Sequence, residues 1–145
     1  MATSPTQYSV RAGTLGNGVS VAYTKDEAIR FDSSPGQSPT LPGPADLLTA
    51  AFAACVLKNV ERMSELLPFA FRSASIEVTS ERQDRPPKIT TIRYRLTVVT
   101  DEPPGRVRLL HENIQRHGTI FNTVADACEV TGEIAAVAPA SLPTL

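Results

Sequence analysis

Apolar residues recur at steps of three and four between residues 44 and 67, the spacing that places side chains on one face of an α-helix. The apolar stripe consists of Leu48, Phe52, Cys55, Val56, Val60, Met63 and Leu67. Pro44 suits the first position of a helix, and Pro68 cannot continue one. Asp46 falls in the first turn, where the positive end of the helix dipole favours a carboxylate. The pattern therefore predicts a central helix over residues 44–67.

Short β-rich segments precede this helix and predict strands within residues 6–32. Residues 7–12 and 18–24 favour two strands, and the stretch GTLGNG between them supplies the Gly and Asn of a hairpin turn. A third short segment, AIRFD, follows. The next stretch, SSPGQSPTLPGP, contains too much Pro and Gly for a strand or a helix. We expect it to form the loop that leads into the central helix.

After the helix, apolar and polar residues alternate, which is the pattern of half-buried strands. Ile76 and Val78 face one way in the first run. In the second run the inward side chains are Ile92, Tyr94, Leu96 and Val98. The stretch QDRPPK between the two runs suits a turn, so residues 72–100 are predicted to form a hairpin.

Prolines and Gly118 enclose a second helical pattern, in which Val107, Leu110, Ile114 and His117 are expected on the inner face. Together with the following stretch TIFNTVADA, it predicts a second helical segment over residues 104–126.

Residues 127–137 are predicted to form the last strand, and residues 138–145 a loose tail. Alternation places four side chains on one face of this strand, unless Gly132 marks a bulge. These side chains are Cys128, Val130, Ile134 and Ala136.

The order is three strands, a long helix, two strands, helices and a strand, which favours an α+β fold with antiparallel sheet. With 145 residues, the chain is expected to be a single domain over residues 1–145. The central helix is also rich in alanine on sides outside its apolar stripe. A second copy of the chain could cover these sides, so a swapped or interlocked dimer is expected.

Charge and composition exclude several classes of partner. The chain has 14 Lys and Arg against 15 Asp and Glu, which argues against a nucleic-acid or membrane-surface partner. It shows neither a signal-peptide pattern nor a run of roughly 20 apolar residues, so we expect a cytoplasmic protein. Cys55, Cys128, His111 and His117 lack the spacing of metal ligands, and no metal site is expected.

Three sequence blocks resemble the OsmC/Ohr family, whose typical members are thiol peroxidases that reduce organic hydroperoxides. GPADLLTAAFAAC looks like the stretch that leads to the family's peroxidatic cysteine. EVTSERQDRPPKITTIRYRL is similar to the two-strand block of the OsmC branch related to the bacterial YhfA proteins. RHGTIFNTV looks like the segment that carries the family's second cysteine.

The resemblance implies an OsmC-like fold, an intertwined homodimer in which antiparallel sheets wrap around long central helices. It also implies a mechanism without a prosthetic cofactor. A thiolate attacks the hydroperoxide, the resulting sulfenic acid condenses with a second cysteine, and an external thiol or dithiol restores the pair. By correspondence, Cys55 is the peroxidatic cysteine.

The chain departs from this pattern where the second cysteine is expected, because Gly118 occupies the corresponding position. Cys128 could replace it only if the last strand brings its Cα within about 7 Å of that of Cys55. The favoured interpretation of Cys128 is a small buried core residue.

The charged candidates are Asp46, Arg30 and Arg11. The acid of Ohr-type members corresponds to Ala45, and Asp46 stands one position later, about 100° around the helix. It could orient an arginine or simply stabilise the start of the helix. Arg30 resembles the arginine of the OsmC branch, and Arg11 is the alternative from the first hairpin. Either could favour the Cys55 thiolate, since a free thiol has a pKa of about 8.5, or could be an exposed charge on a strand edge.

Phe52, His117 and Gly118 are the candidates for binding a ligand, although His117 could instead interact with carbonyls at the end of its helix. Two functions follow. The first is a one-cysteine or impaired hydroperoxide reductase that depends on an external thiol. The alternative is a non-catalytic dimer that binds a small apolar or acyl-like ligand. Gly118 favours that alternative if it leaves open space where a thiol is expected.

Overall fold

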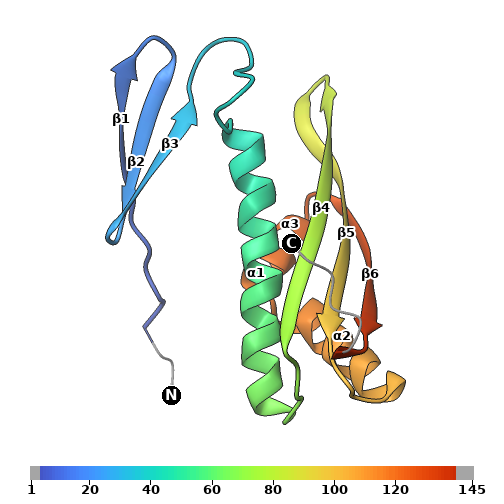
Figure 1. Cartoon of the computed structure of the whole chain (residues 1–145). Helices are drawn as coiled ribbons and strands as arrows, with labels where there is room; N and C mark the ends of the chain where they lie inside the picture. Colours follow the sequence, from blue (N-terminus) through green and yellow to red (C-terminus); the bar gives the residue numbers. More distant parts are fainter. Residues whose placement is uncertain (1–3, 140–145) are drawn as a thin grey trace. The chain divides into compact units, whose positions relative to one another are not determined.

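The computed structural model describes residues 4–139, which form two compact units that meet in the chain between Leu47 and Leu48 (Figure 1). The N-terminal unit holds a three-stranded sheet. The C-terminal unit holds most of the long helix, a second three-stranded sheet and two further helices. Most of the predicted C-terminal tail, residues 140–145, lies outside the described residues.

The N-terminal sheet is an antiparallel meander in the order β1-β2-β3. Its strands are β1 (Arg11–Gly16), β2 (Val19–Thr24) and β3 (Glu27–Asp32). The turn between β1 and β2 needs left-handed backbone, with φ of 55° at Asn17 and 76° at Gly18. Asn and Gly adopt this conformation most readily, so the hairpin turns within the predicted stretch. The strand predicted over residues 7–12 is misplaced, because β1 begins at Arg11 and includes the first four residues of the predicted turn.

The Pro- and Gly-rich loop after β3 is held by one carboxylate. Asp32 accepts hydrogen bonds from the Ser34 hydroxyl, from the Ser34 N–H at 2.9 Å and from the Ser38 N–H at 2.8 Å. These donors favour the charged form and lower the pKa of Asp32. The Asp32 N–H in turn donates to the carbonyl of Pro42 at 2.8 Å, so both ends of the loop are tied together.

Helix α1 (Pro44–Leu66) forms where the apolar stripe predicts it. At its start the Asp46 carboxylate accepts a hydrogen bond from the Gly43 N–H at 2.9 Å, which satisfies a donor that the helix itself leaves free. At its end the chain turns at Pro68. The buried face consists of Phe52, Cys55, Val56, Asn59, Val60 and Met63.

The C-terminal sheet has the order β4-β5-β6, with β4 (Ser73–Asp84), β5 (Pro87–Val99) and β6 (Glu129–Val137). Strands β4 and β5 form the predicted antiparallel hairpin. Strands β5 and β6 are parallel, so the expectation of purely antiparallel sheet is wrong for this pair. The reason is the connection: the helices between β5 and β6 carry the chain back, and the next strand runs in the same direction.

Helices α2 (Pro104–His117) and α3 (Thr119–Ala125) pack on the same face of this sheet as α1. The unit therefore has two layers, with the inward side chains of β5 at its centre. Its largest fully buried apolar side chains are Phe52, Val56, Val60, Ile92, Leu96, Val98, Leu110 and Ile114. Strand β6 pairs without a bulge. Gly132 lies opposite Tyr94, and a Cβ there would overlap the Tyr94 ring at 2.2 Å, so this position requires glycine.

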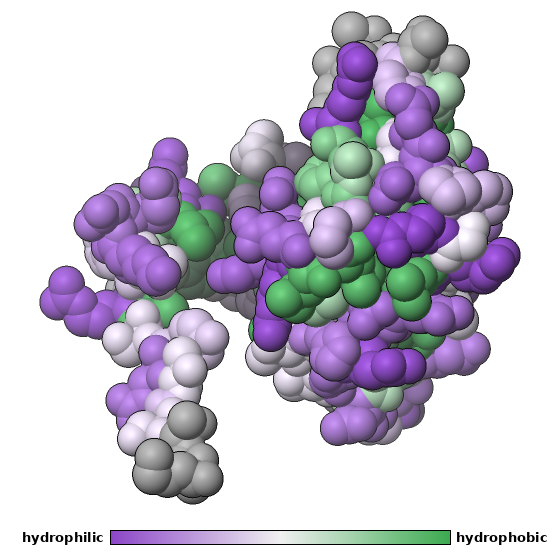
Figure 2. Space-filling view, turned by 90° about the horizontal axis from the view of Figure 1, so that it is seen from below, coloured by the Kyte–Doolittle hydropathy of each residue, from purple (hydrophilic) through white to green (hydrophobic). Residues whose placement is uncertain are grey.

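Some apolar side chains of the C-terminal unit reach solvent. Leu66 at the end of α1 is 64% exposed, and Leu109 on α2 is 38% exposed. Figure 2 shows a band of hydrophobic side chains among hydrophilic ones on the face of this unit that is seen from below.

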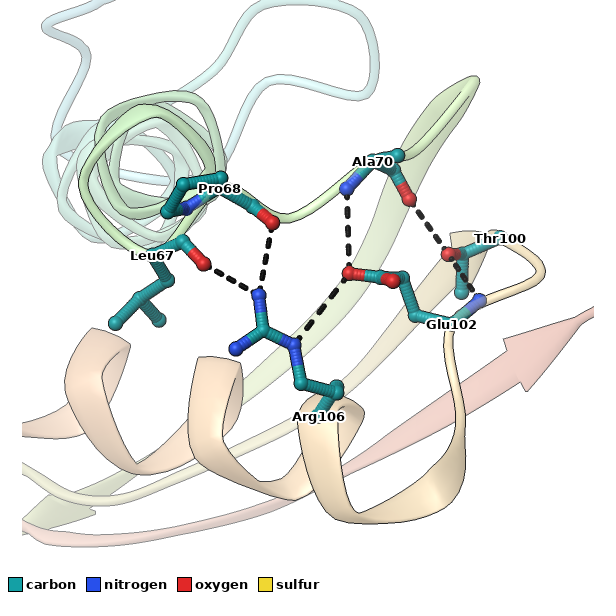
Figure 3. Close-up of polar contacts among 6 residues, drawn as sticks. All are labelled: Leu67, Pro68, Ala70, Thr100, Glu102 and Arg106. Atoms are coloured by element: carbon teal, nitrogen blue, oxygen red, sulfur yellow. Dashed lines mark hydrogen bonds and ion pairs between the residues drawn. The ribbon is translucent and has the colours of Figure 1, made fainter.

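A polar clasp closes the C-terminal end of α1 (Figure 3). The Arg106 guanidinium donates to the carbonyls of Leu67 and Pro68, the latter at 2.8 Å, and its Nε lies 3.6 Å from the Glu102 carboxylate. Glu102 also accepts from the Ala70 N–H, and the Thr100 hydroxyl donates to the Ala70 carbonyl at 2.7 Å. Carbonyls at a helix end lack partners within the helix, so this clasp stabilises the junction of α1 with the sheet.

Candidate functional site

The candidate site centres on Cys55, which α1 presents from its buried face. The Cys55 side chain is 8% exposed and belongs to the apolar core of the C-terminal unit. Within the described residues, Cys55 and Cys128 are both free thiols. A buried free thiol on an apolar helix face can serve as core packing, so its neighbours decide what chemistry is available.

Gly118, between α2 and α3, lies directly against the Cys55 sulfur. A Cβ on residue 118 would lie 3.1 Å from Cys55 Sγ, 2.9 Å from the Cβ of Phe121 and 3.3 Å from the Ile114 carbonyl oxygen. The expectation that Gly118 opens space is therefore wrong, because its neighbours fill the position. With φ of −73°, Gly118 is not needed for left-handed backbone, and close approach is what this position demands.

Asn59 is a polar neighbour of Cys55 that the sequence reasoning missed. Its side chain is 6% exposed, and its Nδ2 donates to the Cys55 carbonyl oxygen at 2.8 Å and lies 3.7 Å from Cys55 Sγ. The signal in the sequence is a carboxamide four residues after the cysteine, between the buried residues Val56 and Val60. Residues four apart share a helix face, so this spacing places Asn59 beside the thiol.

An aromatic cluster lies next to this site. The Phe52 ring is completely buried, with its centroid 5.6 Å from that of Tyr94 and 5.3 Å from that of Phe121. The Cβ of Phe121 is also the atom that a Cβ on residue 118 would meet most closely. In the structure Phe52 therefore packs within the same core as Cys55. A contact between Phe52 and a ligand remains a prediction.

Tyr94, a member of this cluster, forms a hydrogen-bonded group with His111 and Gln115. The Tyr94 hydroxyl is 2.6 Å from His111 Nε2 and accepts from the Gln115 amide at 3.1 Å. Burial disfavours charge on both titrating groups, so it raises the pKa of Tyr94 and lowers the pKa of His111. Because Gln115 supplies a donor to the Tyr94 oxygen, the phenol hydrogen is available to a neutral His111.

Two other candidates, His117 and Cys128, have surroundings that do not suggest a part in thiol chemistry at Cys55. His117 is exposed at the C-terminal end of α2, so its predicted place on the inner helix face is wrong. The Cys128 thiol donates to the Ile89 carbonyl at 3.2 Å, and its side chain packs against the core. Cys128 is half-buried, so the interpretation of it as a small buried core residue is confirmed only in part.

The charged candidates belong to the N-terminal unit. Arg11 is paired with Tyr23, and Arg30 with Val21, across neighbouring strands. Tyr23 and Val21 are two residues apart on β2, so both arginines project from the same face of the sheet. Asp46 caps the start of α1 as described. Its role toward an arginine, and the pairing of either arginine with Cys55, remain predictions.

Within residues 4–139, no group of three or more His, Cys, Asp and Glu side chains could hold a metal ion. Over the same range, no helix is long and apolar enough to cross a bilayer.

A sequence model of the family described as OsmC-like protein matches residues 36–133, a span that includes Cys55, Asn59 and Gly118. The chain belongs to the OsmC-like family. No curated protein sequence matches it.

Solved structures share the fold of this OsmC-like protein at low sequence identity. An OsmC-like protein from Mycoplasma pneumoniae superposes with a TM-score of 0.83 at 16% identity, over 91% of this chain and 98% of the other. An organic hydroperoxide resistance protein OsmC from Legionella pneumophila gives 0.73 at 15% identity, over 90% and 99%. The organic hydroperoxide resistance protein OhrB of Bacillus subtilis gives 0.67 at 15% identity, over 90% and 98%. These likenesses confirm the α+β OsmC-like fold.

Proposed function

We propose that this OsmC-like protein reduces organic hydroperoxides with Cys55 as its single peroxidatic thiol. The observation that carries the proposal is the contact between Cys55 Sγ and position 118. A Cβ there would lie 3.1 Å from the sulfur, and the S–S bond length sets the separation of a sulfur from the far Cβ of a disulfide at about 3 Å. This separation supports position 118, which holds glycine, as the place of the absent resolving cysteine.

The reaction that fits this arrangement has two steps. The Cys55 thiolate attacks the outer oxygen of the hydroperoxide, the O–O bond breaks, and the products are Cys55 sulfenic acid and the alcohol. Two external thiols then reduce the sulfenic acid to the thiol, releasing water and forming one disulfide between themselves. An external monothiol or dithiol is required because Gly118 supplies no second sulfur.

Charged groups of the N-terminal unit are proposed to activate the thiol. Arg30 is the first candidate and Arg11 the alternative, since a neighbouring guanidinium favours the thiolate. Their projection from one sheet face supports a shared environment for the two arginines. Asp46 is proposed to orient the arginine, in addition to capping α1.

Turnover of cumene hydroperoxide with dithiothreitol or a lipoyl dithiol as reductant tests this function. The wild type and Cys128→Ser are expected to consume hydroperoxide at similar rates, whereas Cys55→Ser is expected to lose all protein-dependent consumption. Equal rates for the wild type and Cys55→Ser would exclude Cys55 as the nucleophile.

A second candidate function, the binding of a small apolar or acyl-like ligand, is supported by the burial of Cys55. At 8% exposure and beside the Phe52 and Phe121 rings, the thiol can serve as a small hydrophobe. Native mass spectrometry separates the two functions. A ligand that Cys55→Ala retains, together with no peroxidase turnover by the wild type, would favour binding.

The active form is proposed to be a homodimer. Ala50, Ala51 and Ala54 are exposed on α1, and exposed small apolar residues on a long helix can be covered by a second chain. Sedimentation equilibrium should give twice the chain mass of 15.6 kDa at micromolar concentration. A single-chain mass over the whole concentration range would contradict the dimer.

A further inference from the structure

The Asn59 carboxamide is buried, and only one of its two polar atoms has a hydrogen-bond partner within the described residues. Its Nδ2 donates to the Cys55 carbonyl at 2.8 Å and lies within hydrogen-bonding range of Cys55 Sγ, at 3.7 Å. Its Oδ1 is buried and has no hydrogen-bond partner within the described residues. The Nδ2 end of the carboxamide thus contacts the thiol, and the Oδ1 end is an acceptor without a donor.

Packing and helix stability do not account for this side chain. The Cys55 carbonyl lies within α1, where the backbone N–H four residues later is its regular partner. A buried acceptor without a donor destabilises a protein, and an apolar side chain of similar size would avoid that cost. Val56 and Val60 show that this stretch of the helix face otherwise uses such side chains.

The chemistry of a hydroperoxide matches the two ends of this carboxamide. Its outer oxygen carries the molecule's one O–H donor, and this is the oxygen that the thiolate attacks. The free acceptor of a carboxamide whose other end contacts the sulfur would hold that O–H, while an amide N–H within hydrogen-bonding range of the sulfur would favour its ionised form. Asn59 offers both groups from one rigid helix position.

We propose that Asn59 is a further catalytic residue, whose Oδ1 accepts the O–H of the hydroperoxide while its Nδ2 supports the Cys55 thiolate. This inference rests on the proposed function. The Cys55 thiolate attacks the outer oxygen and becomes the sulfenic acid, the O–O bond breaks, and the departing alkoxide takes from water a proton that replaces the one the thiol released on ionisation. Asn59 positions the O–H for attack and is unchanged by the reaction.

The test compares two reactions of Cys55 in the wild type and in Asn59→Leu, a substitution that keeps the approximate volume but removes both polar groups. Cumene hydroperoxide reports the proposed reaction, and iodoacetamide reports the thiolate without any hydroperoxide O–H. Trypsin separates the two cysteines, since Cys55 falls in residues 31–58 and Cys128 in residues 117–145. Peptide mass spectrometry can therefore follow Cys55 alone.

Asn113→Leu is the matched control. On α2 the Asn113 amide donates to the Leu109 carbonyl at 2.8 Å, the same bond to the residue four positions earlier, but beside a leucine. It should leave both reactions of Cys55 unchanged. Circular dichroism melting checks folding, and Asn59→Ala provides a second variant if the leucine substitution unfolds the protein.

In Asn59→Leu, alkylation is expected to fall roughly threefold to tenfold, and the hydroperoxide reaction about tenfold more than that, since two hydrogen bonds are lost instead of one. A hydroperoxide rate that is unchanged, or that falls no more than alkylation, would overturn the role of Asn59. A wild type that alkylates but does not react with hydroperoxide would instead refute the proposed function.

Discussion

At the scale of the residue, the contact between Gly118 and the Cys55 sulfur depends on a missing side chain. The glycine lets α2 and α3 join directly over the thiol, with Phe121 and Ile114 close on either side. The Cβ of a cysteine at this position would lie 3.1 Å from the sulfur, close to the separation of a sulfur from the far Cβ of a disulfide. Position 118 and the Cys55 sulfur are therefore in direct contact, although residue 118 carries no sulfur.

Gly118→Cys, made in a Cys128→Ser background, is expected to form a disulfide with Cys55 after one equivalent of hydroperoxide. The intact mass should fall by two hydrogens, and tryptic peptides 31–58 and 117–145 should be joined before reduction. The Phe121 Cβ, at 2.9 Å, must shift slightly to admit the new side chain.

Gly105→Cys in the same background is the control for this disulfide. Gly105 lies in the first turn of α2, and its nearest neighbour to a new Cβ is the Arg108 side chain, at 3.9 Å. This variant should keep its thiols free of an intramolecular bond. A Gly118→Cys variant that also stays unlinked would contradict the geometry described for Cys55 and Gly118.

His111 gives the stability of the C-terminal unit a dependence on pH. Burial lowers its pKa in the folded protein, and Glu112 partly opposes this shift. Below the unfolded value of about 6.5, the unfolded chain therefore binds a proton more readily than the folded one. Stability from the neutral His111–Tyr94 pair should be present above that pH and be lost as pH falls toward the lower folded pKa.

Urea unfolding between pH 7.5 and pH 5, a range chosen to bracket the histidine pKa of about 6.5, measures this loss. His111→Gln should flatten the pH dependence, because it removes the titrating group beside Tyr94. The exposed His117 serves for comparison, and His117→Gln should retain the wild-type slope. The interpretation fails if both variants behave alike.

At the scale of the element, the end of α1 depends on contacts from α2. In the polar clasp, Arg106 donates to the carbonyls of Leu67 and Pro68, which directly follow the helix (Figure 3). Arg106→Ala is expected to lower the free energy of unfolding by about 1–2 kcal/mol, a modest value because the side chain is 37% exposed.

Chemical denaturation of Arg106→Ala and Arg108→Ala checks the clasp. Arg108 is exposed on the same helix and should change stability by less than about 0.5 kcal/mol when replaced. Equal effects of the two substitutions would mean that the bonds to Leu67 and Pro68 contribute nothing measurable.

Elements with a strong periodic pattern could be predicted from the sequence, because burial on one face leaves a spacing that can be counted. Helix α1 and the buried face of β5 follow this rule. The parallel pairing of β5 with β6 could not, since alternation fixes the face of a strand but neither its neighbour nor its direction. His117 was misplaced because its helix ends there and leaves the side chain in solvent.

From the sequence, the candidate site could be predicted only at the positions that correspond to the family's sequence blocks. Those blocks single out Cys55 and Gly118, and the structure brings the two together. Asn59 was missed because it interrupts an apolar stripe, and a single polar residue leaves no periodic signal. The Tyr94–His111 pair joins β5 to α2, and such a contact between distant segments has no signature in one sequence.

At the scale of the whole molecule, the candidate site residues divide between the two units. Cys55, Asn59 and Gly118 lie in the C-terminal unit, whereas Arg11 and Arg30 lie on the sheet of the N-terminal unit. The C-terminal unit supplies the sulfur and its immediate hydrogen-bonding groups. The activation of the thiol by an arginine remains a proposal, and the central claim, the reaction of Cys55 as a single thiol, can be tested without it.

The most direct test of that claim is the intact mass of the wild type after one equivalent of cumene hydroperoxide, with and without a dimedone-type sulfenate trap. The wild type should gain one oxygen atom, or one trap adduct that maps to residues 31–58, and Cys55→Ser should gain neither. An unmodified wild type, or one that loses two hydrogens through a bond between Cys55 and Cys128, would contradict the one-cysteine account.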